Sequence, residues 1–207
     1  MSQKELKKVK LRNVFQRKAW KMGPKISLDS ATCMNKSFEV IEAKHLFEVG
    51  PEQIEILVHP EYLCHSLVEF VDGSLLAEIG VPDMRRYIQY ALFYPERKAT
   101  KVSSYLDLIN KKISFEKPPY KKFPCLNFGF EALKIGGTMP AAMLGADEAT
   151  VKAFAEGKVS FMDIPKIIKK TMVAHKPIKN PNLSQIIKAT EWGERKAYDL
   201  CCHYRGR

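Results

Sequence analysis

The sequence predicts an α+β fold, in which a mixed sheet with helices is followed by an all-α helical bundle. Two β-prone runs at 68–71 and 74–77 flank an Asp-Gly pair, which is a strong hairpin signal. Beyond Phe123 the apolar residues recur at helical spacing and no convincing strand follows. The 207 residues are 45% apolar and 28% charged, a composition that suits a globular chain with a core.

Composition divides the chain into four stretches. Residues 1–18 form a basic N-terminal arm, 19–95 an α+β part, 96–124 a connector and 125–207 a C-terminal helical domain. Five apolar residues in the arm have the spacing of a weak amphipathic helix: Leu6, Val9, Leu11, Val14 and Phe15. A mobile arm and a short surface helix are both compatible with this pattern.

The α+β part begins with a predicted helix and strand. Apolar residues from Phe38 to Phe47 share one helical face, and Gly50-Pro51 ends that helix. The apolar run at 54–58 predicts a buried strand.

A hairpin, a helix and an irregular stretch follow. Asp72-Gly73 predicts a type I′ turn, which needs positive φ at both central residues. Pro82-Asp83 then begins a helix over 84–94, and the prolines within 95–124 predict an irregular connector. Beyond the connector, helices are predicted at about 126–134, 147–156, 163–173 and 184–204.

Basic charge is concentrated at the two ends of the chain. The net charge is +11, of which residues 1–25 carry +8 and 166–207 carry +7, so that 26–165 carry −4. A basic tail attracts polyanions without a folded binding surface, and no aromatic-interleaved platform accompanies it. We therefore expect no specific nucleic-acid partner. A basic nucleic-acid binder is the least supported of the three functions that we consider for this chain.

The cysteines and the apolar runs predict a cytoplasmic protein. Five cysteines lack the spacing of a disulfide framework, and neither a membrane segment nor a secretory signal is visible. Cys201-Cys202-His203 is the densest soft-ligand cluster, but consecutive helical residues point about 100° apart, which argues against zinc. The sequence contains no G-x-G-x-x-G or Walker A loop, so it carries no dinucleotide or P-loop fingerprint.

The polar residues around 30–39 predict an anion site. Ser30, Asn35 and Lys36 lie before or at the start of the predicted helix, where the positive helix end favours a phosphate. Glu39 follows Lys36 by three residues, so the two side chains share a face. A carboxylate beside a phosphate-binding lysine repels the ligand unless it holds a divalent cation. The alternative is a capped helix with a surface Lys–Glu pair.

Several stretches resemble the 1-deoxy-D-xylulose 5-phosphate reductoisomerase family. The first are Trp20-Lys21-Met22-Gly23, KISLDSATCMNK at 25–36 and EVIEA at 39–43. The similarity continues, up to the last predicted helix, in His59-Pro60, HSLVEFVDGS at 65–74, PDMR at 82–85, FPCL at 123–126, GGT at 136–138 and FMDI at 161–164.

The resemblance implies an enzyme of the non-mevalonate isoprenoid route. Its substrate would be 1-deoxy-D-xylulose 5-phosphate, which is rearranged and then reduced by NADPH to 2-C-methyl-D-erythritol 4-phosphate. A divalent cation, Mg²⁺ or Mn²⁺, would be required. The α+β part would be the catalytic domain and carry the interface of a homodimer, and the last domain would be a four-helix domain.

The resemblance also implies roles for single residues. Ser30, Asn35 and Lys36 would bind the substrate phosphate and nearby hydroxyls, and Glu39 would be one metal ligand. The implied catalytic residues are Lys36, Glu39 and His65, although a satisfied core histidine is the alternative for His65.

Three further positions follow from the same resemblance. Trp20 and Met22 would bind substrate from a loop that closes over it. Met84 would line the site as a cofactor-binding residue, although simple packing is the alternative there.

The sequence departs from the family pattern in ways that affect activity. The NADPH domain, its glycine-rich loop and the other two metal carboxylates have no counterpart in these 207 residues. Arg17, Ser37 and the segment 144–148 replace a family histidine, a glycine and Asn-Ala-Ala-Asn-Glu. We therefore expect the chain to be inactive alone and to need an NADPH-binding N-terminal domain, which another chain could supply. The alternative is a non-catalytic module that dimerises or binds a phosphorylated ligand.

Overall fold

The structure, a computed structural model, describes residues 3–15, 23–99 and 104–204. These residues form two compact units. The helical unit combines Met1–Glu55 with Pro119–Arg207, and the hairpin unit is Ile56–Pro118. The α+β class predicted from the sequence is confirmed.

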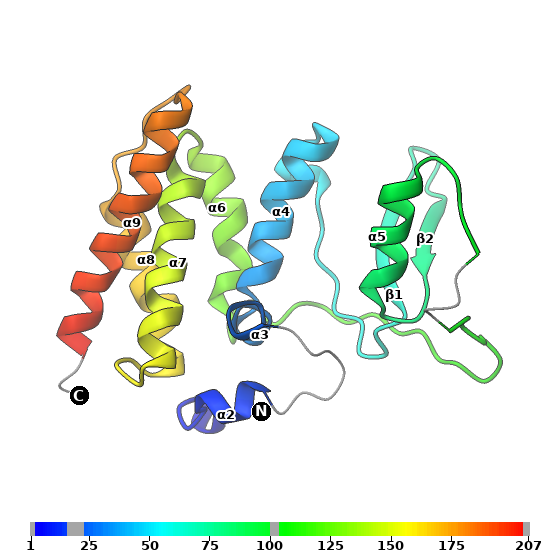
Figure 1. Cartoon of the computed structure of the whole chain (residues 1–207), viewed down its shortest axis with the longest axis horizontal. Helices are drawn as coiled ribbons and strands as arrows, with labels where there is room; N and C mark the ends of the chain where they lie inside the picture. Colours follow the sequence, from blue (N-terminus) through cyan, green and yellow to red (C-terminus); the bar gives the residue numbers. More distant parts are fainter. Residues whose placement is uncertain (1–2, 16–22, 100–103, 205–207) are drawn as a thin grey trace. The chain divides into compact units, whose positions relative to one another are not determined.

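Two long helices form the centre of the helical unit. Helix α7 (Met139–Ala155) and helix α9 (Leu183–Tyr204) lie side by side (Figure 1). They approach closely because glycines face the opposing backbone: a Cβ on Gly145 would lie 2.0 Å from the Thr190 carbonyl oxygen, and one on Gly193 would lie 2.2 Å from that of Ala142. Small residues at a crossing allow this backbone contact.

Shorter helices complete the core of this unit. Helix α8 (Ile164–Ala174), entered through the 3₁₀ turn η3 (Phe161–Asp163), packs on both α7 and α9, and α6 (Phe128–Ile135) packs on α7. Helix α8 buries residues at i, i+3 and i+4 spacing, namely Ile164, Ile167, Ile168, Thr171 and Met172. The four helices predicted in the last part of the sequence are therefore confirmed, with α7 beginning earlier than expected.

Helices from the first part of the chain join the same core. Helix α3 (Pro24–Thr32) leads through a left-handed Cys33, with φ of 63°, into α4 (Met34–Phe47), which packs on α6 and on the 3₁₀ turn η2 (Pro124–Asn127). The helix over α3 was not predicted. A 3₁₀ turn, η1 (Pro51–Gln53), follows α4.

The basic arm forms two short helices where it is described. They are α1 (Gln3–Leu6) and α2 (Leu11–Phe15), and the side chains of Leu6 and Val14 are buried in the helical core. The short-helix alternative therefore describes this stretch, and part of its apolar face is covered.

The hairpin unit is built on two antiparallel strands. Strand β1 (Cys64–Glu69) pairs with β2 (Leu75–Ile79), and helix α5 (Met84–Phe93) follows as predicted. The Asp83 carboxylate caps α5 by accepting a hydrogen bond from the Arg85 amide at 3.0 Å. Glu78 of β2 accepts hydrogen bonds from Arg86 and Tyr87, both at 2.8 Å, and so ties α5 to the strand.

Three expectations about this region need correction. The sheet of the described residues has two antiparallel strands rather than a mixed arrangement. The predicted strand at 54–58 is wrong, because its pairing there is one isolated bridge between Val58 and Glu116. The predicted type I′ turn is also wrong, because Gly73 is the one residue between the two strands with a positive φ. The Phe70 carbonyl accepts a hydrogen bond from the Gly73 amide, and the Phe70 amide donates to the Ser74 carbonyl. This pattern fits a three-residue loop with a glycine bulge.

The division into arm, catalytic part, connector and C-terminal domain stays a prediction. In the structure, α3 and α4 belong to the same compact unit as the C-terminal helices. The described part of the connector is largely irregular, as expected. Within the described residues, no helix has both the length and the apolar character needed to cross a bilayer.

Candidate functional site

The predicted polar cluster exists at the amino end of α4. Asn35 and Lys36 lie in the first turn, and Glu39 lies one turn further along. The Asn35 amide nitrogen donates to Glu39 Oε1, and Lys36 Nζ lies 2.5 Å from Glu39 Oε2. The Lys36 and Glu39 side chains are 48% and 42% exposed, so a ligand from solvent can reach both. An ammonium, an amide and a carboxylate thus meet beside a helix end that favours anions.

Ser30 lies in a different local structure from the one expected. It belongs to the last turn of α3, where its carbonyl oxygen accepts a hydrogen bond from the Cys33 amide at 3.3 Å. The side chain is partly buried. The left-handed turn at Cys33 separates Ser30 from the Asn35–Lys36 pair.

His65 and Met84 belong to the hairpin unit. His65 Nε2 lies 3.0 Å from the Gly80 carbonyl oxygen, and the ring meets Tyr87 edge-on at 6.0 Å. Met84 is the first residue of α5 and is 52% exposed. The roles of both residues stay predictions. Trp20, Met22 and Arg17 lie outside the described residues.

The metal expectation can be tested on Glu39 itself. Both of its carboxylate oxygens are already engaged, by Asn35 and by Lys36. Across residues 3–15, 23–99 and 104–204, no group of three or more His, Cys, Asp or Glu could hold an ion. A divalent cation usually needs several oxygen ligands. The described residues therefore do not form a complete metal site, although Glu39 can supply one ligand.

A buried ionic cluster was missed by the sequence reasoning. Lys25 Nζ lies 2.6 Å from Asp29 Oδ2 and 2.7 Å from Asp147 Oδ2, and it also lies over the Phe38 ring. Asp29 and Asp147 are 3% and 0% exposed. The i, i+4 spacing of Lys25 and Asp29 was visible in the sequence, but nothing there placed Asp147 beside them.

Burial sets the protonation of this cluster. Burial and the Asp29 charge raise the pKa of Asp147 to about 7, against the opposing effect of Lys25. Burial also raises the pKa of Asp29. Burial alone would lower the pKa of Lys25, but the charge of Asp147 and its hydrogen bonds outweigh that effect and raise it.

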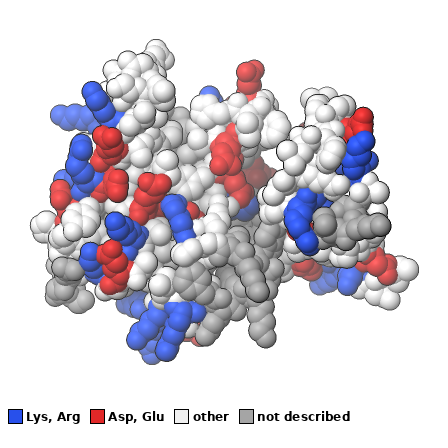
Figure 2. Space-filling view, in the orientation of Figure 1, with Lys and Arg blue, Asp and Glu red and all other residues white. Residues whose placement is uncertain are grey.

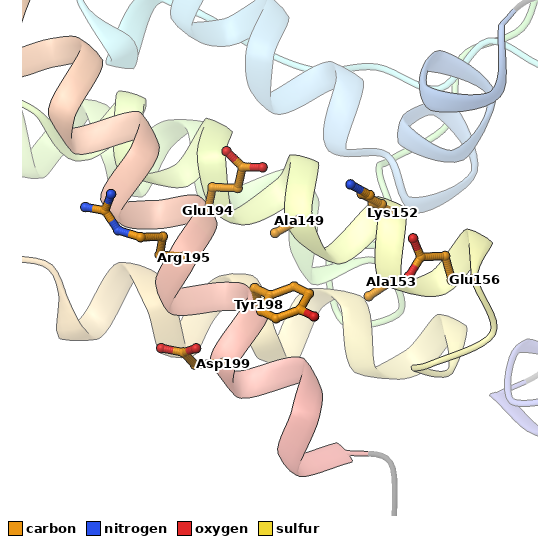
Figure 3. Close-up of a pocket in the computed structure, with 8 residues that line it drawn as sticks. All are labelled: Ala149, Lys152, Ala153, Glu156, Glu194, Arg195, Tyr198 and Asp199. Carbon is orange, nitrogen blue, oxygen red and sulfur yellow. The ribbon is translucent and has the colours of Figure 1, made fainter.

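A surface pocket of about 390 Å³ lies between α7 and α9 (Figure 3). Two alanines, Ala149 and Ala153, line it together with Tyr198 and with side chains of both charges: Lys152, Glu156, Glu194, Arg195 and Asp199. None of the predicted site residues lines it. This mixture gives no preference for a charged ligand.

A second hollow, of about 370 Å³, lies near the end of α3. Phe123, Phe161 and Met162 line it together with four lysines, Lys121, Lys122, Lys166 and Lys169. Lys166 and Lys169 are paired with Asp163 and Glu131.

On the face that Figure 2 shows, the described basic side chains do not form one continuous surface. In Figure 2, Lys and Arg gather near the short N-terminal helices but mix with Asp and Glu over the long helices. On this face, acidic side chains therefore interrupt the basic charge over the long helices. This arrangement offers no extended stripe for a nucleic-acid backbone on the face shown.

Comparison with known proteins identifies one family throughout. Residues 79–196 match a family model described as the DXP reductoisomerase C-terminal domain. Residues 1–47 match a second, described as the 1-deoxy-D-xylulose 5-phosphate reductoisomerase C-terminal domain.

The similar curated proteins carry the same name. The 1-deoxy-D-xylulose 5-phosphate reductoisomerase of Acetivibrio thermocellus is 47% identical over 92% of this chain and 50% of its own length. A Bacillus anthracis homologue, reductoisomerase 1, is 42% identical over 96% of this chain and 52% of its own length. The chain thus spans about half the length of the curated relatives it matches.

Solved structures agree with the sequence comparisons. The reductoisomerase from Zymomonas mobilis in complex with NADPH superposes with a TM-score of 0.88 at 40% identity, over 97% of this chain and 52% of that one. A DOX-P reductoisomerase in complex with NADPH, fosmidomycin and magnesium superposes with a TM-score of 0.89 at 34% identity, over 99% of this chain and 52% of that one. The family models, the relatives and the fold lead to one conclusion: this chain belongs to the 1-deoxy-D-xylulose 5-phosphate reductoisomerase family.

Proposed function

We propose that this chain is the substrate- and metal-binding portion of an NADPH-dependent 1-deoxy-D-xylulose 5-phosphate reductoisomerase. The whole enzyme would rearrange that substrate and reduce it to 2-C-methyl-D-erythritol 4-phosphate, in non-mevalonate isoprenoid biosynthesis. The observation that carries the proposal is the meeting of Asn35, Lys36 and Glu39 at the amino end of α4, in a chain of this family.

Phosphate binding is the role that this geometry supports best. Lys36 and Glu39 form a half-exposed ion pair, which contributes at most about 1 kcal/mol. A phosphate can therefore replace the carboxylate as the partner of Lys36 at little cost. Asn35 would donate a second hydrogen bond, and Ser30 would contribute its hydroxyl from α3. Binding at this point, remote from the breaking bond, would orient the substrate.

The remaining site residues are proposed on the family resemblance. His65 would act beside the reacting carbons, Met84 would lie against the cofactor, and Trp20 and Met22 would cover the substrate and exclude water. Glu39 would leave its present partners to become one ligand of Mg²⁺ or Mn²⁺, with the other ligands supplied from outside the described residues. Such an ion would act as a Lewis acid on substrate oxygens.

We infer that the chain by itself neither binds NADPH firmly nor turns over substrate. Its 207 residues contain no glycine-rich dinucleotide loop and offer a single carboxylate at the proposed metal position. Activity would require an NADPH-binding N-terminal domain, which another chain could supply. A cytoplasmic location, without nucleic acid or membrane as partner, stays a prediction.

Self-association into a homodimer is supported by the surface of the hairpin. Val68 and Leu76 face each other across the strands and are 52% and 62% exposed. Phe70 and Leu75 are also more than half exposed. Exposed apolar residues gathered on one small sheet are typical of an interaction surface.

Reconstitution tests the proposed function directly. The purified chain is mixed with the N-terminal half of the Acetivibrio thermocellus relative, Mn²⁺, NADPH and 1-deoxy-D-xylulose 5-phosphate. We expect consumption of NADPH in the mixture and none with either half alone. Consumption by this chain alone would disprove the inferred incompleteness.

A non-catalytic module that dimerises or binds a phosphorylated ligand is the second candidate. It is favoured by Ser37, which replaces a family glycine and is fully buried against η2 and α6. This candidate predicts binding of the phosphorylated sugar without NADPH consumption in the same mixture.

A further inference from the structure

Two buried carboxyl groups from different helices share one lysine. Asp29 of α3 and Asp147 of α7 each direct Oδ2 at Lys25 Nζ, at 2.6 and 2.7 Å. The Lys25 side chain is 39% exposed, whereas both acids are almost completely buried. The cluster joins residues 122 positions apart and lies where α3 packs on α7.

The second carboxylate oxygen of each acid lacks a hydrogen-bond donor in the described part of the chain. Among the described residues, Asp29 Oδ1 and Asp147 Oδ1 are buried and have no hydrogen-bond partner. A buried oxygen without a partner costs about 1–3 kcal/mol. The two carboxyl groups meet at the same ammonium, because Lys25 Nζ lies 2.6 Å from one Oδ2 and 2.7 Å from the other. One proton between them would supply the missing partner for both groups.

Full ionisation of the cluster is unfavourable. Two carboxylates with one ammonium would leave a net charge of −1 on a cluster whose two acids are almost completely buried. Two carboxylates in contact cannot both ionise easily, because each raises the proton affinity of the other. One shared proton makes the cluster neutral overall.

We propose that Asp147 shares one proton with Asp29 and is a positioning residue, which fixes α3 against α7 through this acid pair. Helix α3 also carries Ser30, so the pair would help to orient that hydroxyl, a consequence that rests on the proposed function. The acid pair itself requires no substrate, metal or cofactor.

The surroundings determine when the shared proton is lost. Two titratable groups interact with the acid pair: Lys25 on α3 and the Cys125 thiol on η2. Burial and the charges of the two acids raise the pKa of the Cys125 thiol. Burial and Asp29 raise the pKa of Asp147 to about 7, above its ordinary value of 3.8. The folded chain therefore holds more protons than the unfolded chain between these values, and the free energy of unfolding falls as the pH rises through that window.

Asp147→Asn offers a sharp test, because the amide supplies a permanent N–H to Asp29. Glu148→Gln is the matched control, since Glu148 is the neighbouring residue on α7 and is exposed. At pH about 6, where ordinary carboxyl groups are ionised, the wild-type chain should show the infrared C=O stretch of a protonated carboxyl. We expect Asp147→Asn to lose this band and the control to retain it.

A pH series provides the second readout. The melting temperature of Asp147→Asn relative to wild type should rise between pH about 4 and about 7 and then level off. Amide hydrogen exchange in α3, corrected for its intrinsic pH dependence, should accelerate above pH about 7 in wild type and not in the variant. If Asp147→Asn does not fold, the same measurements are made on Asp29→Asn. That variant places the amide donor on the other acid of the pair.

The proposal is overturned if the protonated-carboxyl band is absent from wild type or survives in the Asn variants. It is also overturned if the pH profiles of wild type and variant run parallel. Both measurements use the chain alone, without substrate, so they are independent of the reconstitution that tests the proposed function.

Discussion

Lys36 and Asn35 are held by one carboxylate, and this small network decides how the amino end of α4 can act. Both residues donate to Glu39 from positions one helical turn away. Local spacing along a helix is sufficient to bring such side chains together. For this reason the cluster could be predicted from the sequence, whereas its ligand is a proposal.

Replacing Lys36 tests the phosphate role. We expect Lys36→Ala to weaken binding of 1-deoxy-D-xylulose 5-phosphate by about tenfold to a hundredfold, because a charge-assisted hydrogen bond contributes about 1.5–3 kcal/mol. Calorimetric titration of the reconstituted enzyme measures this. Binding of the unphosphorylated sugar should change little.

The matched control is Lys44→Ala, in the last turn of the same helix. It should leave affinity unchanged. Since the Lys36–Glu39 pair is half-exposed, Lys36→Ala should also leave the melting temperature nearly unchanged. A large fall in melting temperature would instead identify Lys36 as a structural residue.

Glu39→Gln tests the metal role at the same helix end. The substitution keeps the shape and a hydrogen-bond acceptor for Asn35 but removes the charge that a hard cation requires. We expect the Mn²⁺ concentration for half-maximal activity of the reconstituted enzyme to rise at least about tenfold. Glu42→Gln, an exposed acid on the same helix, is the control. An unchanged Mn²⁺ requirement in Glu39→Gln would contradict the ligand assignment.

At the scale of elements, local signals predicted helices better than they predicted strands. Helices α5, α8 and α9 begin and end within a few residues of their predicted limits, because caps and apolar periodicity act within one segment. The strand expected at 54–58 failed because a strand needs a partner along its length. The described residues offer it one bridge, although Ile56 is buried.

The α7–α9 crossing gives a prediction at this scale. Gly193→Ala should improve the helix propensity of α9 by about 0.5–1 kcal/mol. The new Cβ, however, would lie 2.2 Å from the Ala142 carbonyl oxygen, and the helices must separate to accept it. Overpacking of this kind costs about 1–3 kcal/mol.

We therefore expect a net loss of about 1–2 kcal/mol in the free energy of unfolding, measured by urea denaturation. Glu191→Ala, on the exposed side of α9, should be nearly neutral. A stabilised Gly193→Ala chain would mean that α7 and α9 do not approach so closely.

At the scale of the whole molecule, the exposed hairpin predicts self-association. Leu76→Lys places a charge in the proposed interface, opposite Val68. Loss of a central apolar contact costs about 2 kcal/mol or more, so the dimer dissociation constant should rise at least about tenfold. Sedimentation equilibrium measures this change.

Leu183→Lys is the control for that variant, because Leu183 is 72% exposed but belongs to the helical unit. It should leave the association constant unchanged. If both variants changed the dimer dissociation constant equally, the hairpin would not be the dimer surface.

The sequence by itself determined the family, the α+β class, most helices, the position of the hairpin and the Asn35–Lys36–Glu39 cluster. Each of these depends on residues close together in the chain or on long matching motifs. Tertiary structure alone decided the contacts between distant residues: Asp147 beside Lys25, and Ser37 Oγ accepting from the Gly129 amide at 2.8 Å. It also decided that α3 and α4 belong to the helical core. The physical reason is that periodicity shows which face of a helix is buried, but only packing selects the partner that covers it.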